Sequence, residues 1–330
     1  MSLITKAEFF LFFIIILGFF CFVPNTAQAA SSSIRYTTVY GKKYTYLRDV
    51  ARFYGMTCTY SGDKAILSSK YSRLVFTMNK KYCHINKTKV NLITPAVKYK
   101  YFRCISVDDF FKTIDPIMRH WALNKKPVKI IMIDPGHGGT DNGGSGKRIN
   151  ERMVTLPIAK KVAFILQKSG YKVYLTRNRD KSLSLEQRPA LAKQIKADIF
   201  VSIHANKATS PNASGIETFC VTPVGAASTH SRKPSYTKHP NNKHNANNVS
   251  LAYHIQNALI KKTKAVDRGM KHARFMVIKQ AECPAALVEV GFLSNIKEEN
   301  RIATDWYQWV LARGIAEGIK KYHYQVKRRK

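Results

Sequence analysis

The stretch from Lys129 to Glu151 constrains this chain most, because a buried strand runs directly into a loop dense in glycine. The apolar run that ends at Asp134 is short and bounded by proline and glycine, which is typical of a fully covered strand. The loop holds one histidine, His137, and glycines at 136, 138, 139, 143, 144 and 146. Such a loop adds little to a core. Its backbone can pass close to a ligand, with one imidazole aimed at it.

Strands and helices are predicted to alternate from Val128 onward. This pattern indicates an α/β fold with a mostly parallel central sheet flanked by helices on both faces. Pro157 should kink the first helix or move its start toward Thr155. We expect strands at 129–134, 171–176, 198–203, 215–221, 274–279 and 285–290, and helices at about 152–168, 184–196, 249–263 and 304–322.

Residues 31–127 have a different texture, rich in tyrosine, threonine and lysine, with alternating apolar and polar residues between turn signals. They predict a small β-rich α+β accessory domain. The main domain would span 128–324, with an insert loop at 222–250 and a basic tail at 325–330. A loop this long is usually a lid, a binding loop or a disordered insert. Its histidines match no helix or strand face, so a second metal site is not expected there.

Residues 1–29 have the pattern of a secretory signal peptide. Lys6 precedes a dense apolar run, and Ala27-Gln28-Ala29 offers a signal-peptidase site. The alternative is an uncleaved membrane anchor, but polar residues end the run before a comfortable spanning length. We expect an exported protein of the periplasm, cell envelope or extracellular space, without a stable membrane anchor after cleavage. Five cysteines would remain, an odd number that leaves at least one thiol free or paired between chains.

The charge balance indicates anionic partners. Lys and Arg number 55 against 20 Asp and Glu, a formal net charge of +35. This charge is compatible with nucleic acid, anionic lipid or a cell-wall polymer as the partner. Export favours the wall polymer, so nucleic acid is not expected as a partner.

Polar residues follow several predicted strands where each strand ends. His137, His204 and Glu289 lie at carboxyl ends, which gather along one crevice in an open α/β sheet. The glycine loop can fold Glu151 back to the same point. Two imidazoles and a carboxylate form a common catalytic zinc shell whose fourth position is open to water. His137, Glu151 and His204 would be ligands of one Zn²⁺, and Glu289 the general base and later the acid.

Each of these residues also has a structural explanation. A lone histidine at a strand end is usually a hydrogen-bonded core residue, and a glutamate near a helix start is usually a partner of the helix dipole. Glu289 is harder to dismiss, because an unpaired buried carboxylate costs several kcal/mol. Together on one sheet edge, the four residues favour a site. Asn206 and Arg188 are weaker candidates for positioning the site or binding the substrate.

Several ordered motifs resemble the zinc-dependent N-acetylmuramoyl-L-alanine amidases (the amidase-3 family) over residues 129–323. The resemblance maps the family's zinc ligands onto His137, Glu151 and His204, and its catalytic glutamate onto Glu289. It implies cleavage of the amide between the lactyl group of N-acetylmuramic acid and L-alanine in peptidoglycan. The motifs are Asp134-Pro-Gly-His-Gly-Gly139, Asn150-Glu151, Leu175-Thr-Arg177, Ser202-Ile-His-Ala-Asn206, Gly215-Ile-Glu-Thr218 and Val288-Glu-Val-Gly-Phe-Leu-Ser-Asn295.

The resemblance implies a role in wall remodelling or daughter-cell separation. Residues 31–127 loosely resemble the N-terminal domain of copper amine oxidases, which implies a recognition or spacer role. An activator or wall protein would bind through this domain or through the 222–250 loop. Two alternatives stay open, a zinc peptidase that cuts within the stem peptide and a non-catalytic wall-binding protein.

Overall fold

The computed structural model describes residues 34–231 and 233–328. The predicted signal peptide lies outside this range. No helix within the described ranges is both long enough and apolar enough to cross a membrane. The five cysteines within the same ranges are all free thiols.

One sheet of 11 strands organises the molecule. Its first four strands run parallel: β11 (Lys172–Leu175), β10 (Ile130–Pro135), β12 (Ile199–Asn206) and β15 (Ala285–Phe292). Next come β13 (Ile216–Val221), antiparallel to β15, and β14 (Asp267–Ala273), parallel to β13. A single bridge from Met270 to Val90 joins β14 to β7. The meander β7 (Thr88–Asn91), β6 (Tyr82–Ile85), β5 (Arg73–Thr77), β4 (Lys64–Ser68) and β3 (Thr57–Ser61) completes the sheet.

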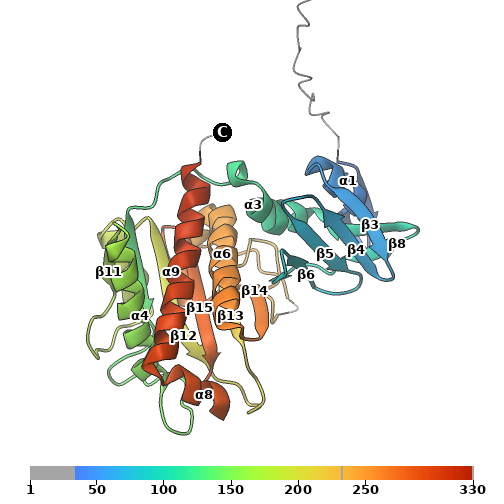
Figure 1. Cartoon of the computed structure of the whole chain (residues 1–330). Helices are drawn as coiled ribbons and strands as arrows, with labels where there is room; N and C mark the ends of the chain where they lie inside the picture. The colour runs from blue at the N-terminus through green and yellow to red at the C-terminus, as the bar shows by residue number, and fades with distance from the viewer. Residues whose placement is uncertain (1–33, 232, 329–330) are drawn as a thin grey trace, which may run out of the picture. The chain divides into compact units, whose positions relative to one another are not determined.

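Helices cover both faces of the first six strands, and Figure 1 shows α4, α6 and α9 on one of these faces. One face packs against α4 (Glu151–Lys168), α6 (Asn245–Thr263) and α9 (Asp305–Lys327), whose apolar residues share one core with alternate strand residues. The other face packs a smaller core against α5 (Gln187–Gln194) and α7 (Met276–Lys279). A short helix, α8 (Ile296–Ile302), follows β15. The predicted α/β class is confirmed, and the large sheet is mixed.

The front region is β-rich, as predicted. A separate four-stranded sheet contains β1 (Tyr36–Val39), β2 (Lys42–Tyr46), β9 (Phe102–Ser106) and β8 (Val97–Tyr99). Short helical elements accompany it: α1 (Leu47–Phe53), α2 (Val107–Asp109), η1 (Phe110–Ile114), α3 (Asp115–Met118) and η2 (His120–Ala122). The division of the chain near residue 127 stays a prediction, because the large sheet continues from one side of it to the other.

Two local expectations were wrong. The apolar run 274–279 was predicted as a strand, but it contains helix α7, and the strand is the preceding, more polar β14. A short apolar run cannot be assigned to strand or helix by periodicity alone. The 222–250 loop is also more ordered than expected. It contains a bridge between Ala227 and Pro234, the short helix η3 (Pro240–His244) and the first turns of α6.

Pro157 neither ends nor shortens α4, which begins at Glu151 with the proline inside it. A proline in a helix interior deprives the carbonyl four residues earlier of its hydrogen bond. That carbonyl belongs to Met153, whose side chain is exposed, so water can reach this turn. The expected start near Thr155 was therefore wrong.

We expect Gly318→Ala to destabilise the protein by about 1–3 kcal/mol, because overpacking at a tight helix contact forces the backbones apart. A Cβ at Gly318 would lie 2.4 Å from Ile255 Cα and 2.8 Å from the His254 carbonyl oxygen. Chemical denaturation measures the change. Lys320→Ala, at an exposed site on the same helix, is the control and should stay near the parent stability. Equal midpoints for the two variants would contradict this packing.

Candidate metal centre

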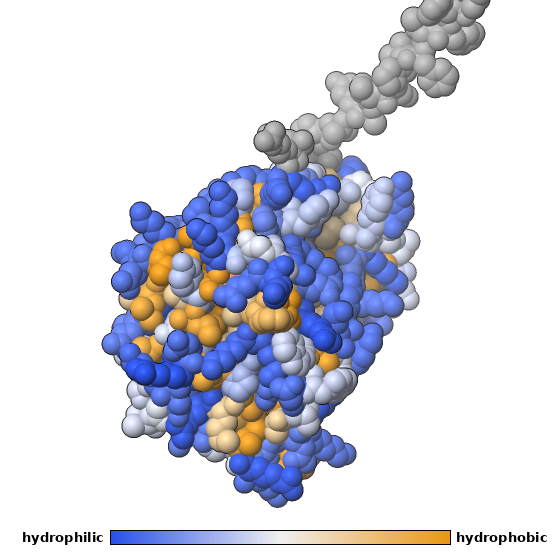
Figure 2. Space-filling view, turned by 60° about the vertical axis from the view of Figure 1, so that its left-hand side comes forward, coloured by the Kyte–Doolittle hydropathy of each residue, from blue (hydrophilic) through white to orange (hydrophobic). Residues whose placement is uncertain are grey.

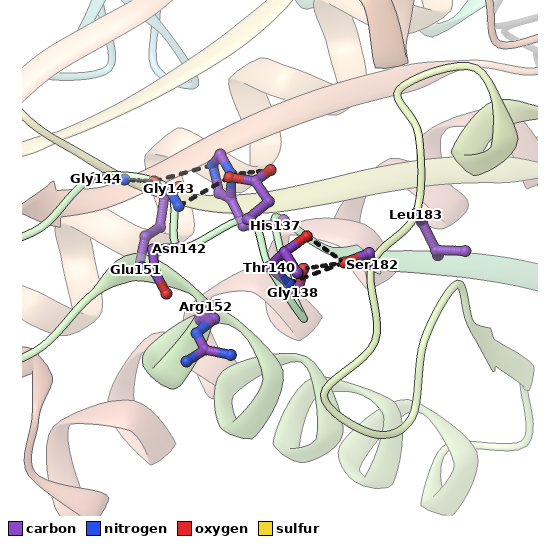
Figure 3. A network of polar contacts seen from close by, with 12 residues as sticks. His137, Gly138, Thr140, Asn142, Gly143, Gly144, Glu151, Arg152, Ser182 and Leu183 are labelled. Carbon is purple, nitrogen blue, oxygen red and sulfur yellow. Dashed lines mark hydrogen bonds and ion pairs between the residues drawn. The ribbon is translucent and has the colours of Figure 1, made fainter.

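The three residues predicted as metal ligands converge on one point. His137 follows β10, Glu151 is the first residue of α4, and His204 lies near the end of β12. One donor atom from each lies within 4.8 Å of the others. Figure 3 shows His137 and Glu151 turned toward one another. The structure therefore brings these side chains together, and their role as ligands stays a prediction.

Glu151 is the centre of the cluster. Its Oε2 lies 3.0 Å from His137 Nε2, and its Oε1 lies 2.8 Å from His204 Nδ1. Backbone N–H groups of Gly144 and Ala205 donate to the same two oxygens. Burial would raise the pKa of Glu151, but the hydrogen bonds from the two histidines outweigh it and hold the pKa below its usual range. The carboxylate is therefore ionised at neutral pH, as a metal ligand must be.

A hydrogen bond to Asp141 fixes the orientation of the His137 ring. Its Nδ1 lies 2.8 Å from Asp141 Oδ2, and its backbone has a φ of 58°. Left-handed φ costs a residue with a side chain about 1–2 kcal/mol, so the surrounding loop must enforce it. A metal-ligating histidine commonly gives its second ring nitrogen to a carboxylate. Asp141 is placed to do this for His137. It was not among the site residues predicted from the sequence.

The loop glycines leave room for the cluster. A Cβ on Gly136 would lie 2.4 Å from the His204 ring, and one on Gly143 would lie 2.5 Å from His137 Cδ2. Gly143 also has a φ of +65°. These two positions therefore require glycine, as the sequence predicted for a backbone that passes close to a site.

A buried ion pair supports the loop that carries His137. Arg188 Nη1 lies 2.8 Å from Asp134 Oδ1, with exposed side-chain fractions of 2% and 0%. The same guanidinium donates to the carbonyls of Pro135 and His137. Arg188 is thus too deeply buried for direct substrate contact, and it positions the His137 loop instead.

Glu289 completes the centre from the next strand. It is the register partner of His204 between β12 and β15. Its Oε2 is shielded from solvent and has no hydrogen-bond partner among the described residues, and the same holds for His204 Nε2. Burial raises the pKa of Glu289 well above its usual range, the carboxylates of Glu151 and Glu217 raise it further, and Lys271 opposes them. Two unpartnered buried polar atoms beside an ionised carboxylate fit a bound cation and a reacting group.

A second carboxylate, Glu217, lies opposite Glu289 in the antiparallel β13–β15 pair. It accepts from Lys271 Nζ at 2.6 Å, Arg268 Nε at 2.8 Å and Asn206 Nδ2 at 3.0 Å. Burial would raise the pKa of Glu217, but Lys271 and Arg268 lower it. Asn206, predicted as a weak positioning candidate, is therefore held beside the centre. The sequence signal for Glu217 was a charged residue inside a buried strand, the same signal that identified Glu289.

The 222–250 loop carries histidines outside this cluster. His230 Nε2 lies 3.1 Å from Lys271 Nζ, and His244 Nε2 lies 2.7 Å from the Glu282 carbonyl oxygen. Within the described ranges, the His137–Glu151–His204 group is the one cluster with metal-ligand geometry.

The fold and the site define an α/β protein whose parallel strands end at a cluster suited to a metal ion. Residues 131–321 match the family model described as N-acetylmuramoyl-L-alanine amidase. This match covers more than half of the chain, so the chain belongs to that family of hydrolases. The resemblance seen in the motifs is confirmed.

Individual relatives agree. The chain is 34% identical over 226 residues to N-acetylmuramoyl-L-alanine amidase AmiC of Escherichia coli O6:H1, covering 61% of this chain and 54% of AmiC. It is 30% identical over 247 residues to AmiA of Escherichia coli strain K12, covering 67% of this chain and 86% of AmiA. The chain thus spans about half of AmiC and most of AmiA.

Among solved structures, the chain is similar to the CwlD amidase from Clostridioides difficile in complex with the GerS lipoprotein. The TM-score is 0.51 at 29% identity, over 59% of this chain and 98% of that one.

We expect Asp141→Ala to weaken metal binding by about 10–100-fold, the usual effect of removing the carboxylate that orients a ligating histidine. Competition against a chromogenic zinc chelator measures the dissociation constant. Asp63→Ala, at an exposed turn in the front region, is the control. An unchanged zinc dissociation constant in the Asp141 variant would show that this residue does not support metal binding.

Proposed function

We propose that this chain is a zinc-dependent amidase that hydrolyses the bond between the lactyl group of N-acetylmuramic acid and L-alanine in peptidoglycan. The observation that carries the proposal is the His137–Glu151–His204 cluster with the shielded carboxylate of Glu289 beside it. Family membership selects the bond, since the matching family and relatives share the name of this activity.

The donor set suits zinc. Two imidazoles and a carboxylate are a common catalytic zinc shell that leaves one position open. Zinc bound there would polarise the amide carbonyl and make a water molecule acidic. His137, Glu151 and His204 would hold this single ion, with Asp141 fixing the first histidine.

The remaining chemistry falls to residues of the chain itself. Glu289 would take the proton of the attacking water and deliver it to the leaving nitrogen of L-alanine. Its environment suits both roles, because a shielded carboxyl with a raised pKa retains a proton readily once it has one. Asn206, held by Glu217 at 3.0 Å, would orient the substrate carbonyl.

The setting of this activity would be the cell envelope. The signal-like residues 1–29 and the net charge of +35 support export and an anionic wall. Wall remodelling or daughter-cell separation is the corresponding role. The CwlD structure contains a lipoprotein partner, which supports a regulatory partner here, through the front region or the 222–250 loop.

Two alternative functions are to be distinguished from the amidase. A zinc peptidase would cut between amino acids of the stem peptide, and a wall-binding protein would cut nothing. Product analysis on purified sacculi, with and without a zinc chelator, separates them. New lactyl-muramic ends paired with free L-alanine amino groups support the amidase. Cleavage between amino acids, or none with full zinc occupancy, overturns it.

Glu289→Gln should keep its zinc and lose at least about 100-fold in turnover, because a carboxamide cannot accept the proton. Elemental analysis gives the metal content and muropeptide release gives the rate. Glu186→Gln, at an exposed residue outside the cluster, is the control. Near-parent activity in the Glu289 variant would refute its assigned role.

His204→Ala should bind little zinc, because the shell loses one of three protein ligands. We expect about one zinc per parent chain and a small fraction of that in the variant, measured after dialysis by elemental analysis. His244→Ala, which alters an imidazole of the 222–250 loop, should keep its zinc. A full zinc content in the His204 variant would exclude this residue as a ligand.

A further inference from the structure

One face of the large sheet continues from Glu289 into the front region. Residues in a strand alternate between faces, so register decides which side chains share one. Thr218 and Val90 are both register partners of Met270 and face α6, where Thr218 bonds Gln256. Their neighbours Glu217, Lys271 and Lys89 therefore face the opposite side, together with Glu289.

Three cations lie along this face. Arg268 and Lys271 belong to β14 and Lys89 belongs to β7. We name them the β14–β7 strip. Lys89 makes no ion pair with any carboxylate in the described ranges, and its ammonium lies 4.6 Å from the Tyr82 ring centroid. Two carboxylates contact the strip. Glu217 pairs with Arg268 and Lys271, and Asp267 accepts from the backbone N–H of Lys89 at 2.7 Å. The strip therefore carries excess positive charge.

Arg268 of β14 retains a donor for a ligand. Arg268 gives Nε to Glu217 and Nη1 to the Ser214 carbonyl, while Nη2 has no described hydrogen-bond partner. Its guanidinium carbon lies 4.6 Å from the Phe292 ring centroid, which fixes the plane of the group. Lys271 Nζ contacts Glu217 and His230, and its side chain is only 6% exposed, so Lys271 adds positive charge to the strip rather than a direct contact. A planar guanidinium with a free edge is suited to carboxylates.

The strip is within reach of a substrate cut at Glu289. The path from β15 through β13 and β14 to β7 crosses three strand spacings, about 14 Å. An extended peptide of about four residues spans that distance. The 222–250 loop borders this path, because Thr229 exchanges hydrogen bonds with His272 on β14 and places His230 beside Lys271.

We propose that the β14–β7 strip binds the carboxylates of the peptidoglycan stem peptide, so that the front region takes part in substrate binding. This inference rests on the proposed amidase function and adds the part of the substrate that the chain recognises. The support is charge complementarity and the shared sheet face that leads from Glu289 to Lys89. Lys89 comes from the front region, which gives that region a role in substrate binding.

The test compares two soluble muropeptides, a disaccharide tetrapeptide with free carboxylates and the same compound with its carboxylates amidated. We expect the parent enzyme to prefer the charged substrate in kcat/KM. Lys89→Gln should lose about threefold on the charged substrate through KM, the usual size for a partly exposed charge pair, and nothing on the amidated one. Arg268→Gln should reduce the same preference further.

Lys172→Gln is the matched control, because Lys172 is an exposed strand lysine at the opposite edge of the same sheet. Circular dichroism and the melting temperature confirm that each variant folds. Equal kcat/KM for the two substrates in the parent enzyme would overturn the proposal, as would an undiminished preference in Lys89→Gln. A loss seen on intact sacculi but absent on soluble muropeptides would point to an anionic polymer, and would also overturn it.

The experiments distinguish a failure of the proposed amidase function from a failure of the strip proposal. If the zinc-loaded parent cleaves neither muropeptide, the proposed function is wrong. Calorimetry then measures the binding of the same two compounds to the parent and to Lys89→Gln, which tests the strip proposal without catalysis. Weaker binding of the charged compound to the variant would support the proposal, and identical binding would refute it.

Discussion

The buried carboxylate of Asp134 is the interaction on which the site depends. It lies at the end of β10 and accepts from Thr176 Oγ1, Arg188 Nη1 and Ser202 Oγ at 2.6–2.8 Å. These partners come from the end of β11, from α5 and from β12, so one carboxylate ties four segments together. A charge buried at 0% exposure is stable only with such partners, and removing one typically costs about 3–5 kcal/mol.

The position of His137 follows from that anchor. Arg188 reaches past Asp134 to the carbonyls of Pro135 and His137, and so fixes the first residues of the loop. The loop must then reverse within a few residues to bring Glu151 back. Gly136 and Gly143 allow this because their missing side chains leave space for the two histidine rings. On the face drawn in Figure 2, hydrophilic residues predominate and apolar residues form separate areas.

Sequence reasoning predicted the class of fold and the residues at the strand ends, for a physical reason. Parallel strands gather their carboxyl ends at one edge, so polar residues there can be placed without knowing the strand order. Partners such as Asp141 and Lys271 were missed because they depend on loop conformation and on register. The strand order also cannot be read from periodicity, nor can the reversal by which β13 and its parallel neighbour β14 run antiparallel to β15.

The error at β14 has the same origin as the charge of the strip. β14 is polar for a central strand because Arg268 and Lys271 neutralise Glu217, a buried carboxylate beside the centre. The polar composition of β14 therefore did not predict a strand, whereas the apolar residues of α7 did. The two cations make β14 a poor match to a strand pattern, and they also extend positive charge from the candidate metal centre toward the front region. Local conflict between sequence and structure thus marks the surface where we place the substrate.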